Sequence, residues 1–183
     1  MRTMREILAL VCGYLNKQRI GYVLVGGIVV SIHGVPRSTI DADLILSLEE
    51  KALARLIGFL RKNGFSASLE DAREAFADGS HFSAEDTLSH LRLDLKGIYN
   101  EMDRNAYERR IRFGFNGVEM MIESPEDLIA AKLHFGSEQD LRDAEGVFIS
   151  KSGKLDLEHL NATCLSYGVS KELGALMKRA RKR

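Results

Sequence analysis

The segment from Asp41 to Leu48 constrains the fold more than any other part of this 183-residue sequence. Its even-numbered residues, beginning with Ala42, are all apolar, and they fall on one face of a strand because successive side chains alternate. Asp41 and Asp43 share the opposite face, which Ile45 continues. The segment therefore predicts a strand with one face in the core. Two carboxylates project together from the other face. The apolar Ile45 on that same face indicates that the face is covered by other parts of the chain beyond the carboxylates.

Periodicity elsewhere predicts strands mixed with helices. Further strands are expected at 22–25, 65–69, 88–95, 111–115 and 118–122, the last two flanking an Asn116-Gly117 hairpin turn. Helices are expected at 2–17, 28–33 and 49–63, whereas the polar stretch 70–86 is ambiguous. Ser124 as N-cap and Pro125 at the first helical position open a helical tail with breaks near Gly136, Gly153 and Gly168.

These elements predict an α/β (or α+β) fold with a mixed β-sheet flanked by helices. We expect a catalytic core at 1–123 and a short helical C-terminal extension at 124–183, packed together as one compact unit. The extension ends in a basic run at 178–183, which could contact RNA phosphates, although a solvated helix end is the interpretation we favour.

Composition excludes several classes of function. Lys and Arg (26) balance Asp and Glu (26), which argues against a generic polyanion-binding protein. Cys12 and Cys164 are far apart and lack CxxC spacing, so we expect small apolar residues in helices rather than a disulfide or a zinc site. No apolar run approaches the ~20 residues that span a bilayer, and no secretory signal is evident. A cytoplasmic protein without membrane contact is expected.

The aspartates are the strongest candidates for chemistry. Two adjacent carboxylates resist joint ionisation unless a cation compensates them, and Mg²⁺ prefers oxygen ligands of this kind. Asp94 adds a third carboxylate on the polar face of the strand expected at 88–95. Three carboxylates on neighbouring strands could hold two metal ions ~4 Å apart for displacement at phosphorus. The Asp-x-Asp pattern alone also occurs by chance.

Gly26 and Gly27 end a strand and begin a short helix, where backbone amides can approach a phosphate. The pair matches neither the Walker A loop nor the dinucleotide-binding fingerprint, and by itself it could be a tight turn. His33 could bind a metal, but we favour a turn cap or a residue on a helix face.

Together these motifs resemble the nucleotidyltransferase superfamily, which has a polymerase-beta-like fold. The resemblance lies in Val25-Gly26-Gly27 and the run 33–44, His-Gly-Val-Pro-Arg-Ser-Thr-Ile-Asp-Ala-Asp-Leu. The Arg-x-Thr-x-Asp-x-Asp-Leu version looks like the AbiEii-type toxin branch. The run 124–129, Ser-Pro-Glu-Asp-Leu-Ile, with Lys132 and then Arg142-Asp143, is similar to that branch's downstream helix pair. The resemblance spans about 22–147, and full-length toxins of the branch are typically longer.

The resemblance implies a role for each matching residue. Asp41 and Asp43 would bind two Mg²⁺ ions, and Asp94 would accept a proton from the attacking hydroxyl or complete one metal site. The implied nucleotide-binding residues are Gly26, Gly27, Arg37, Thr39 and Lys132. The Arg142-Asp143 pair could instead be an ion pair between helices.

The implied activity is Mg²⁺-dependent transfer of a nucleoside monophosphate from a nucleoside triphosphate to an acceptor hydroxyl. The acceptor could be an RNA 3′ end, a protein or a small molecule. The enzyme could be a toxin held in check by an antitoxin protein. The alternative is a catalytically inactive module that binds a nucleotide or a partner.

Overall fold

Seven strands form one mixed sheet in a computed structural model that describes residues 1–115 and 117–181. Their order across the sheet is β3-β4-β5-β2-β1-β7-β6, and the pairs β2–β5 and β1–β7 are parallel while the others are antiparallel. The strands are β1 Gly21–Val25, β2 Asp41–Ser47, β3 Phe65–Ser66, β4 His81–Asp86, β5 Arg92–Lys96, β6 Ile111–Phe115 and β7 Val118–Ile122. The mixed α/β fold class is confirmed.

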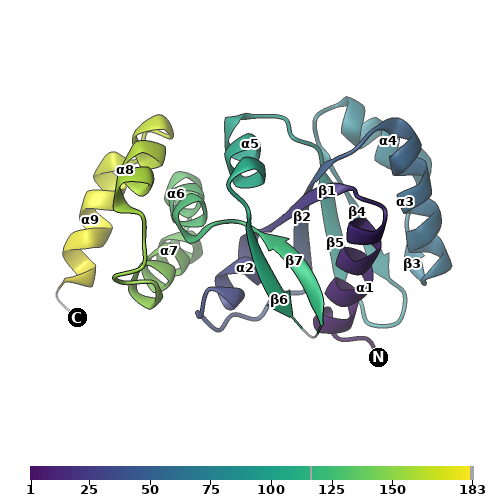
Figure 1. Cartoon of the computed structure of the whole chain (residues 1–183), viewed down its shortest axis with the longest axis horizontal. Helices are drawn as coiled ribbons and strands as arrows, with labels where there is room; N and C mark the ends of the chain where they lie inside the picture. The colour runs from purple at the N-terminus through teal and green to yellow at the C-terminus, as the bar shows by residue number, and fades with distance from the viewer. Residues whose placement is uncertain (116, 182–183) are drawn as a thin grey trace.

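Nine helices lie within the described ranges. Some flank the sheet, and others are gathered at one end of the molecule (Figure 1). The nine helices are α1 Met4–Lys17, α2 Gly26–Ile32, α3 Glu50–Lys62, α4 Leu69–Ala77, α5 Glu101–Glu108, α6 Pro125–Phe135, α7 Glu138–Ser150, α8 Leu157–Ser166 and α9 Ser170–Ala180. None of these described helices is long and apolar enough to cross a membrane. Cys12 and Cys164 are buried free thiols in α1 and α8, as expected.

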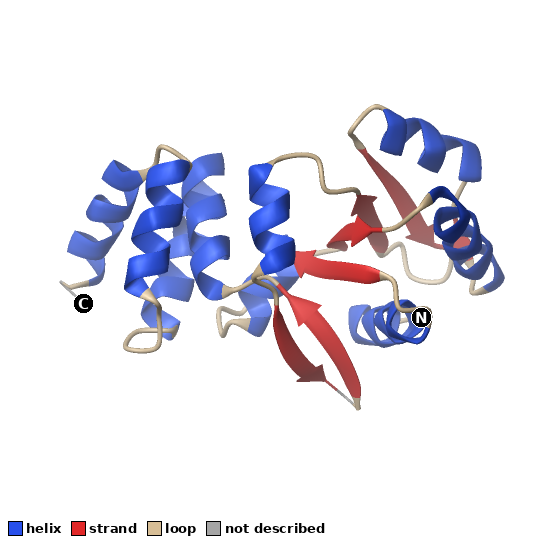
Figure 2. Cartoon of the chain, turned by 45° about the horizontal axis from the view of Figure 1, so that its top comes forward, coloured by secondary structure: helices blue, strands red, loops and turns tan. Residues whose placement is uncertain are grey.

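The alternation in β2 organises the core. Ala42, Leu44 and Leu46 are fully or almost fully buried in the main apolar cluster, to which α1, α3 and α6 also contribute. On the opposite face Ile45 is also buried, where it packs in a smaller cluster with Ala106 of α5. Figure 2 shows α1 and α5 on opposite sides of the sheet. The expectation that the aspartate face is covered beyond its carboxylates is therefore confirmed.

The helical tail begins as its caps predict. The Ser124 hydroxyl accepts a hydrogen bond from the Asp127 amide, and Pro125 occupies the first turn of α6. Gly136, Gly153 and Gly168, at positive φ, lie in the breaks between the four C-terminal helices. Figure 1 shows these helices gathered at one end of the molecule. The division into a core and an extension at 123/124 stays a prediction.

Two local predictions need correction, and one ambiguous stretch has a definite structure. The ambiguous stretch 70–86 contains α4, whose N-cap Ser68 accepts a hydrogen bond from the Asp71 amide, and the strand β4. The strand expected at 88–95 begins only at Arg92, since a turn with His90 at φ 60° precedes it. The strand expected at 65–69 has only two residues.

Helix α5 was not predicted. Only Asp103 and Ala106 of its eight residues are buried, so no apolar periodicity marks it in the sequence. β6 and β7 pair antiparallel as expected, but Asn116 of the turn lies outside the described residues.

Candidate functional site

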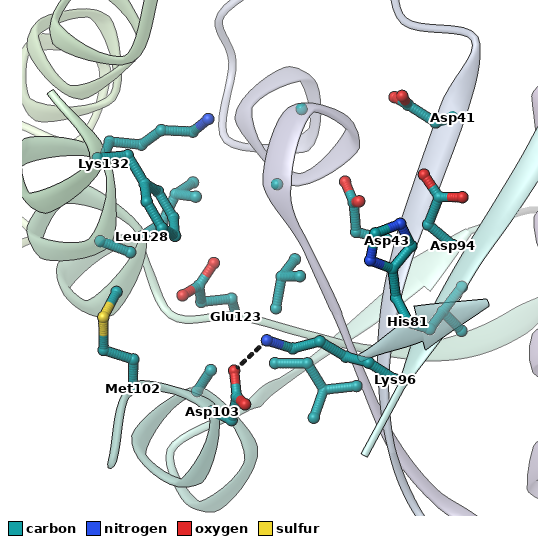
Figure 3. Close-up of a pocket in the computed structure, with 18 of the residues that line it drawn as sticks. Asp41, Asp43, His81, Asp94, Lys96, Met102, Asp103, Glu123, Leu128 and Lys132 are labelled. Carbon is teal, nitrogen blue, oxygen red and sulfur yellow. Dashed lines mark ion pairs between the residues drawn. The ribbon is translucent and has the colours of Figure 1, made fainter. Parts of the chain in front are cut away.

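The parallel pairing of β2 with β5 brings the predicted aspartates together. Asp43 lies opposite Asp94 in the strand register, and Asp41 lies opposite Arg92. All four side chains share one face of the sheet because strand residues two apart point the same way. A pocket of about 420 Å³ opens on this face (Figure 3). The predicted site residues that line it are Gly26, Gly27, Arg37, Asp41, Asp43, Asp94 and Lys132.

Asp43 is a partly buried carboxylate whose surroundings disfavour its charged form. Burial, followed by repulsion from Asp41 and Asp94, raises the pKa of Asp43 to about 6. The Asp41 pKa is lowered instead, chiefly because the Thr39 hydroxyl donates a hydrogen bond to its carboxylate. Thr39, predicted to bind nucleotide, thus contacts Asp41, and it is not among the described residues that line the pocket.

Arg92 is a site residue to which sequence reasoning assigned no role. Its Nη2 lies 3.0 Å from Asp41 Oδ2, and its Nε lies 3.2 Å from Asp94 Oδ2. The Ser83 hydroxyl donates to the other oxygen of Asp94 at 2.5 Å. The only signal in the sequence is that Arg92 alternates with Asp94, which places both on the polar face of their strand.

The donor set of the aspartates has the chemistry that Mg²⁺ prefers. Within the described ranges, however, no three His, Cys, Asp or Glu side chains are grouped so that they could hold one metal ion. Arg92 and Thr39 hold Asp41, and Arg92 and Ser83 hold Asp94, whereas Asp43 has no hydrogen bond or ion pair to its carboxylate among the described residues. Their roles as metal ligands stay a prediction.

The glycine pair lies directly beside these carboxylates. Gly26 begins α2 with φ 71°, a backbone conformation that favours glycine. A Cβ on Gly27 would lie 3.2 Å from Cζ of Arg37, so the second glycine also sits against a predicted site residue.

The predicted cations Arg37 and Lys132 meet at Asp143 of α7. Arg37 forms an ion pair with Asp143, and Lys132 Nζ lies 2.7 Å from Asp140 and 3.6 Å from Asp143. Lys132 is only 8% exposed and lines the pocket from α6. Asp143 of the Arg142-Asp143 motif thus forms an ion pair between helices, with Lys132 of α6, whereas Arg142 pairs with Glu138 one turn away on α7.

Glu123, between β7 and α6, is a second pocket residue that sequence reasoning missed. It is 5% exposed, and burial followed by repulsion from Asp127 raises its pKa to about 8. Among the described residues its carboxyl has no hydrogen bond or ion pair, whereas nearby Asp103 is paired with Lys96 at 2.6 Å (Figure 3). The sequence does contain a signal for Glu123: it is a charged residue that directly follows an apolar strand and directly precedes the N-cap Ser124.

The remaining candidates lie elsewhere. His33 is the C-cap residue of α2 and is buried. Its Nε2 lies 2.9 Å from the Glu123 carbonyl oxygen. This position at the end of a helix agrees with the turn cap that we favoured. In the basic run, Arg179 pairs with Glu145, while Lys182 and Arg183 lie outside the described residues.

The fold is similar to those of solved nucleotidyltransferases. The solution structure of antibiotic-resistance factor ANT(2″)-Ia matches with a TM-score of 0.62 and 13% identity over 97% of each chain. An antigenic nucleotidyltransferase-like protein from Paracoccidioides brasiliensis gives 0.60 and 17%, covering 95% of this chain and 91% of its own. Lincomycin-bound lincosamide adenylyltransferase LnuA gives 0.54 and 16%, covering 79% and 96%. At these identities the likeness shows the fold alone.

No curated protein sequence matches the chain. A family model does match it, from residue 2 to residue 175, and its description is "Nucleotidyltransferase of unknown function (DUF6036)". With nearly the whole chain covered, and with a fold shared with solved nucleotidyltransferases, this protein belongs to the DUF6036 nucleotidyltransferase family.

Proposed function

We propose that the protein transfers a nucleoside monophosphate from a nucleoside triphosphate to an acceptor hydroxyl, in a reaction that requires Mg²⁺. The observation that carries this proposal is the register of β2 with β5, which sets Asp43 beside Asp94. Gly26 adjoins Asp43 in the same pocket, and Lys132 lines its other wall. Carboxylates, a glycine turn and a cation are the groups that a triphosphate and its metal need.

Asp41 and Asp43 would hold the metal. When bound, Mg²⁺ supplies charge stabilisation at the transferring phosphorus. Gly26 and Gly27 would let backbone amides approach the β- and γ-phosphates, while Arg37 and Lys132 offset the triphosphate charge. Asp94 would orient the acceptor hydroxyl or accept its proton. The expectation of two Mg²⁺ ions is part of this proposal.

A labelled-nucleotide assay tests the proposal. The protein is incubated with each of the four α-labelled nucleoside triphosphates and Mg²⁺, together with bulk RNA, protein extract, tobramycin or lincomycin. We expect labelled product with one acceptor class, and none with EDTA or with Asp43→Asn. Asp78→Asn, an exposed residue at the end of α4, is the matched control and should keep activity. Absence of product from every combination would count against the proposal.

The acceptor panel reflects two sources of support. One structure of ANT(2″)-Ia holds adenylyl-2″-tobramycin, and that of LnuA holds lincomycin, which favours a small-molecule acceptor. The AbiEii-like motif between Arg37 and Leu44 supports instead an RNA or protein acceptor, a cytoplasmic toxin role and an antitoxin partner. Expression in a bacterial host distinguishes a toxin from an enzyme that modifies a small molecule. A toxin arrests growth, Asp43→Asn relieves the arrest, and a gene adjacent to the toxin gene protects the cell.

A second candidate function is nucleotide or partner binding without turnover. The observation in its favour is Arg92, whose single positive charge is paired with both Asp41 and Asp94 and so offsets part of the charge of the two carboxylates. Calorimetry with each nucleoside triphosphate and Mg²⁺ decides between the two. Binding without any product would favour this module over the enzyme.

A further inference from the structure

Glu123 is a buried carboxyl that lines the pocket and has no partner in the described part of the chain. The residue is only 5% exposed, and its oxygens are not sealed inside the protein but face the pocket. Figure 3 shows its side chain beside Met102 of α5 and Leu128 of α6. A buried carboxyl without a partner is unfavourable, so a ligand that pairs with it gains binding energy.

The positive charges of the pocket wall are already paired elsewhere. Among the described residues, Lys96 Nζ lies 2.6 Å from Asp103, and Lys132 Nζ lies 2.7 Å from Asp140. The arginine that lines the pocket pairs with α7. A cation that pairs with Glu123 therefore has to come from a ligand.

The charges around Glu123 favour such a cation. Negative charges on Asp127, Asp103 and Asp43 act on the Glu123 carboxyl, and Lys132 opposes them. The same surroundings repel an anionic ligand group such as a phosphate. A bound cation would also favour the ionised form of the carboxyl, because an opposite charge nearby lowers a carboxyl pKa.

The neighbours of Glu123 suit an organic cation better than a metal ion. A divalent ion needs several oxygen ligands, and within the described ranges no three His, Cys, Asp or Glu side chains are grouped to hold one. Met102 and Leu128 present apolar surface instead. An ammonium group needs only one carboxylate, and its carbon skeleton can pack against these apolar side chains.

Glu123 lies close enough to the aspartates to bind the same molecule. Ile122, just before it, pairs with Leu24, and the Glu123 amide donates to the Leu24 carbonyl at 2.9 Å. Val25, the next residue of β1, pairs with Asp43. Glu123 is therefore two strand spacings from Asp43, roughly 10 Å. One acceptor molecule can place a hydroxyl at the aspartates and an ammonium group at Glu123.

We propose that Glu123 binds an ammonium group of the acceptor, so that the acceptor is an alcohol that also carries an amine. The ammonium group holds the acceptor while its hydroxyl lies beside Asp43 and Asp94. This inference rests on the proposed function, because it names the class of acceptor for the transfer reaction.

Saturation-transfer NMR of the ligands tests the binding step without turnover. The full chain, at pH 7 and without nucleotide, is mixed with two matched pairs of compounds, glucosamine with glucose and aminopentanol with pentanediol. Within each pair an amine replaces one hydroxyl. We expect each amine to bind more tightly than its parent alcohol. Glu123→Gln should weaken amine binding about tenfold and leave the binding of the parent alcohols unchanged, because it removes a charge-assisted hydrogen bond.

Three controls accompany this measurement. Glu74→Gln removes an exposed carboxylate on α4 and should bind the amines as the wild type does. N-acetylglucosamine keeps an N–H group but lacks the charge, and it should bind no better than glucose. Circular dichroism and thermal melting confirm that each variant is folded before its binding is compared.

The outcomes distinguish this inference from the proposed function. Equal binding of amines and parent alcohols, or unchanged amine binding by Glu123→Gln, overturns the inference and leaves the transfer reaction standing. Weaker binding of nucleoside triphosphates by Glu123→Gln, with amine binding intact, also overturns it and assigns Glu123 to the nucleotide. Absence of labelled product in the transfer assay counts against the proposed function, whereas amine binding that depends on Glu123 would still identify an ammonium site.

Discussion

A Cβ atom on Gly26 would lie 2.3 Å from Oδ2 of Asp43, so the backbone that follows β1 is in contact with the central carboxylate of the pocket. The contact joins the end of one strand to the neighbouring strand, which pairs Val25 with Asp43. It explains why glycine is required here by space as well as by its φ of 71°.

Gly26→Ala should therefore destabilise the protein by about 1–3 kcal/mol, because alanine strains a left-handed backbone and displaces the Asp43 side chain. Urea denaturation measures the change. Gly174→Ala is the control, because that glycine lies inside α9 with nothing within 4 Å of an added Cβ, and alanine should stabilise the helix by about 0.5–1 kcal/mol. Equal effects of the two substitutions would contradict the contact.

Asp43→Asn should abolish nucleotidyl transfer and yet stabilise the metal-free protein at pH 7. Burial first, and then repulsion from Asp41 and Asp94, disfavours the charged Asp43 carboxylate, and a neutral amide avoids both costs. We expect a gain on the order of 2 kcal/mol, since one pKa unit corresponds to about 1.4 kcal/mol. Thermal melting in EDTA measures it, with Asp78→Asn unchanged. A less stable Asp43→Asn protein would contradict the electrostatic account.

Glu123 should make stability depend on pH. Its pKa of about 8 in the folded protein exceeds the ordinary value of 4.5, so the folded state holds a proton that the unfolded state releases. The stabilising effect is complete below about pH 4.5 and is lost as pH rises toward 8. Across this window the free energy of unfolding should fall by up to about 1.4 kcal/mol per pH unit relative to Glu123→Gln.

Urea denaturation of both proteins at pH 5.5, 7 and 8 measures this difference. Glu74→Gln, at an exposed position on α4, provides a control for loss of one carboxylate. Parallel stability profiles for the wild type and Glu123→Gln would show that the Glu123 carboxyl is not held protonated.

Lys132→Met should weaken both stability and polyphosphate binding. The substitution leaves the half-buried Asp140 and the buried Asp143 with less compensating charge. We therefore expect the free energy of unfolding to fall by about 3 kcal/mol. Thermal melting and calorimetry with inorganic tripolyphosphate measure the two effects. Arg142→Met is the matched control, because the exposed Arg142–Glu138 pair contributes less than about 1 kcal/mol. Unchanged tripolyphosphate affinity would remove Lys132 from the nucleotide site.

Local patterns in the sequence predicted most of the fold because they depend on neighbours along the chain. The alternation in β2 and the Ser124 cap of α6 are properties of a few consecutive residues, and both appear where expected. Helix α5 escaped prediction because only two of its residues are buried. The buried side of α5 is set by its contact with the sheet, and a contact between distant segments leaves no periodic pattern in the local sequence.

The same distinction applies to the candidate site. By itself the sequence determined that Gly26, Asp41 and Asp43 belong together, since they flank one short helix and one strand start. Only the tertiary structure decided that Asp94 adjoins Asp43 and that Arg92 bridges two carboxylates, because both relationships depend on strand register. Burial and charge at Glu123 likewise come from residues distant in the chain, so its raised pKa exists only in the folded protein.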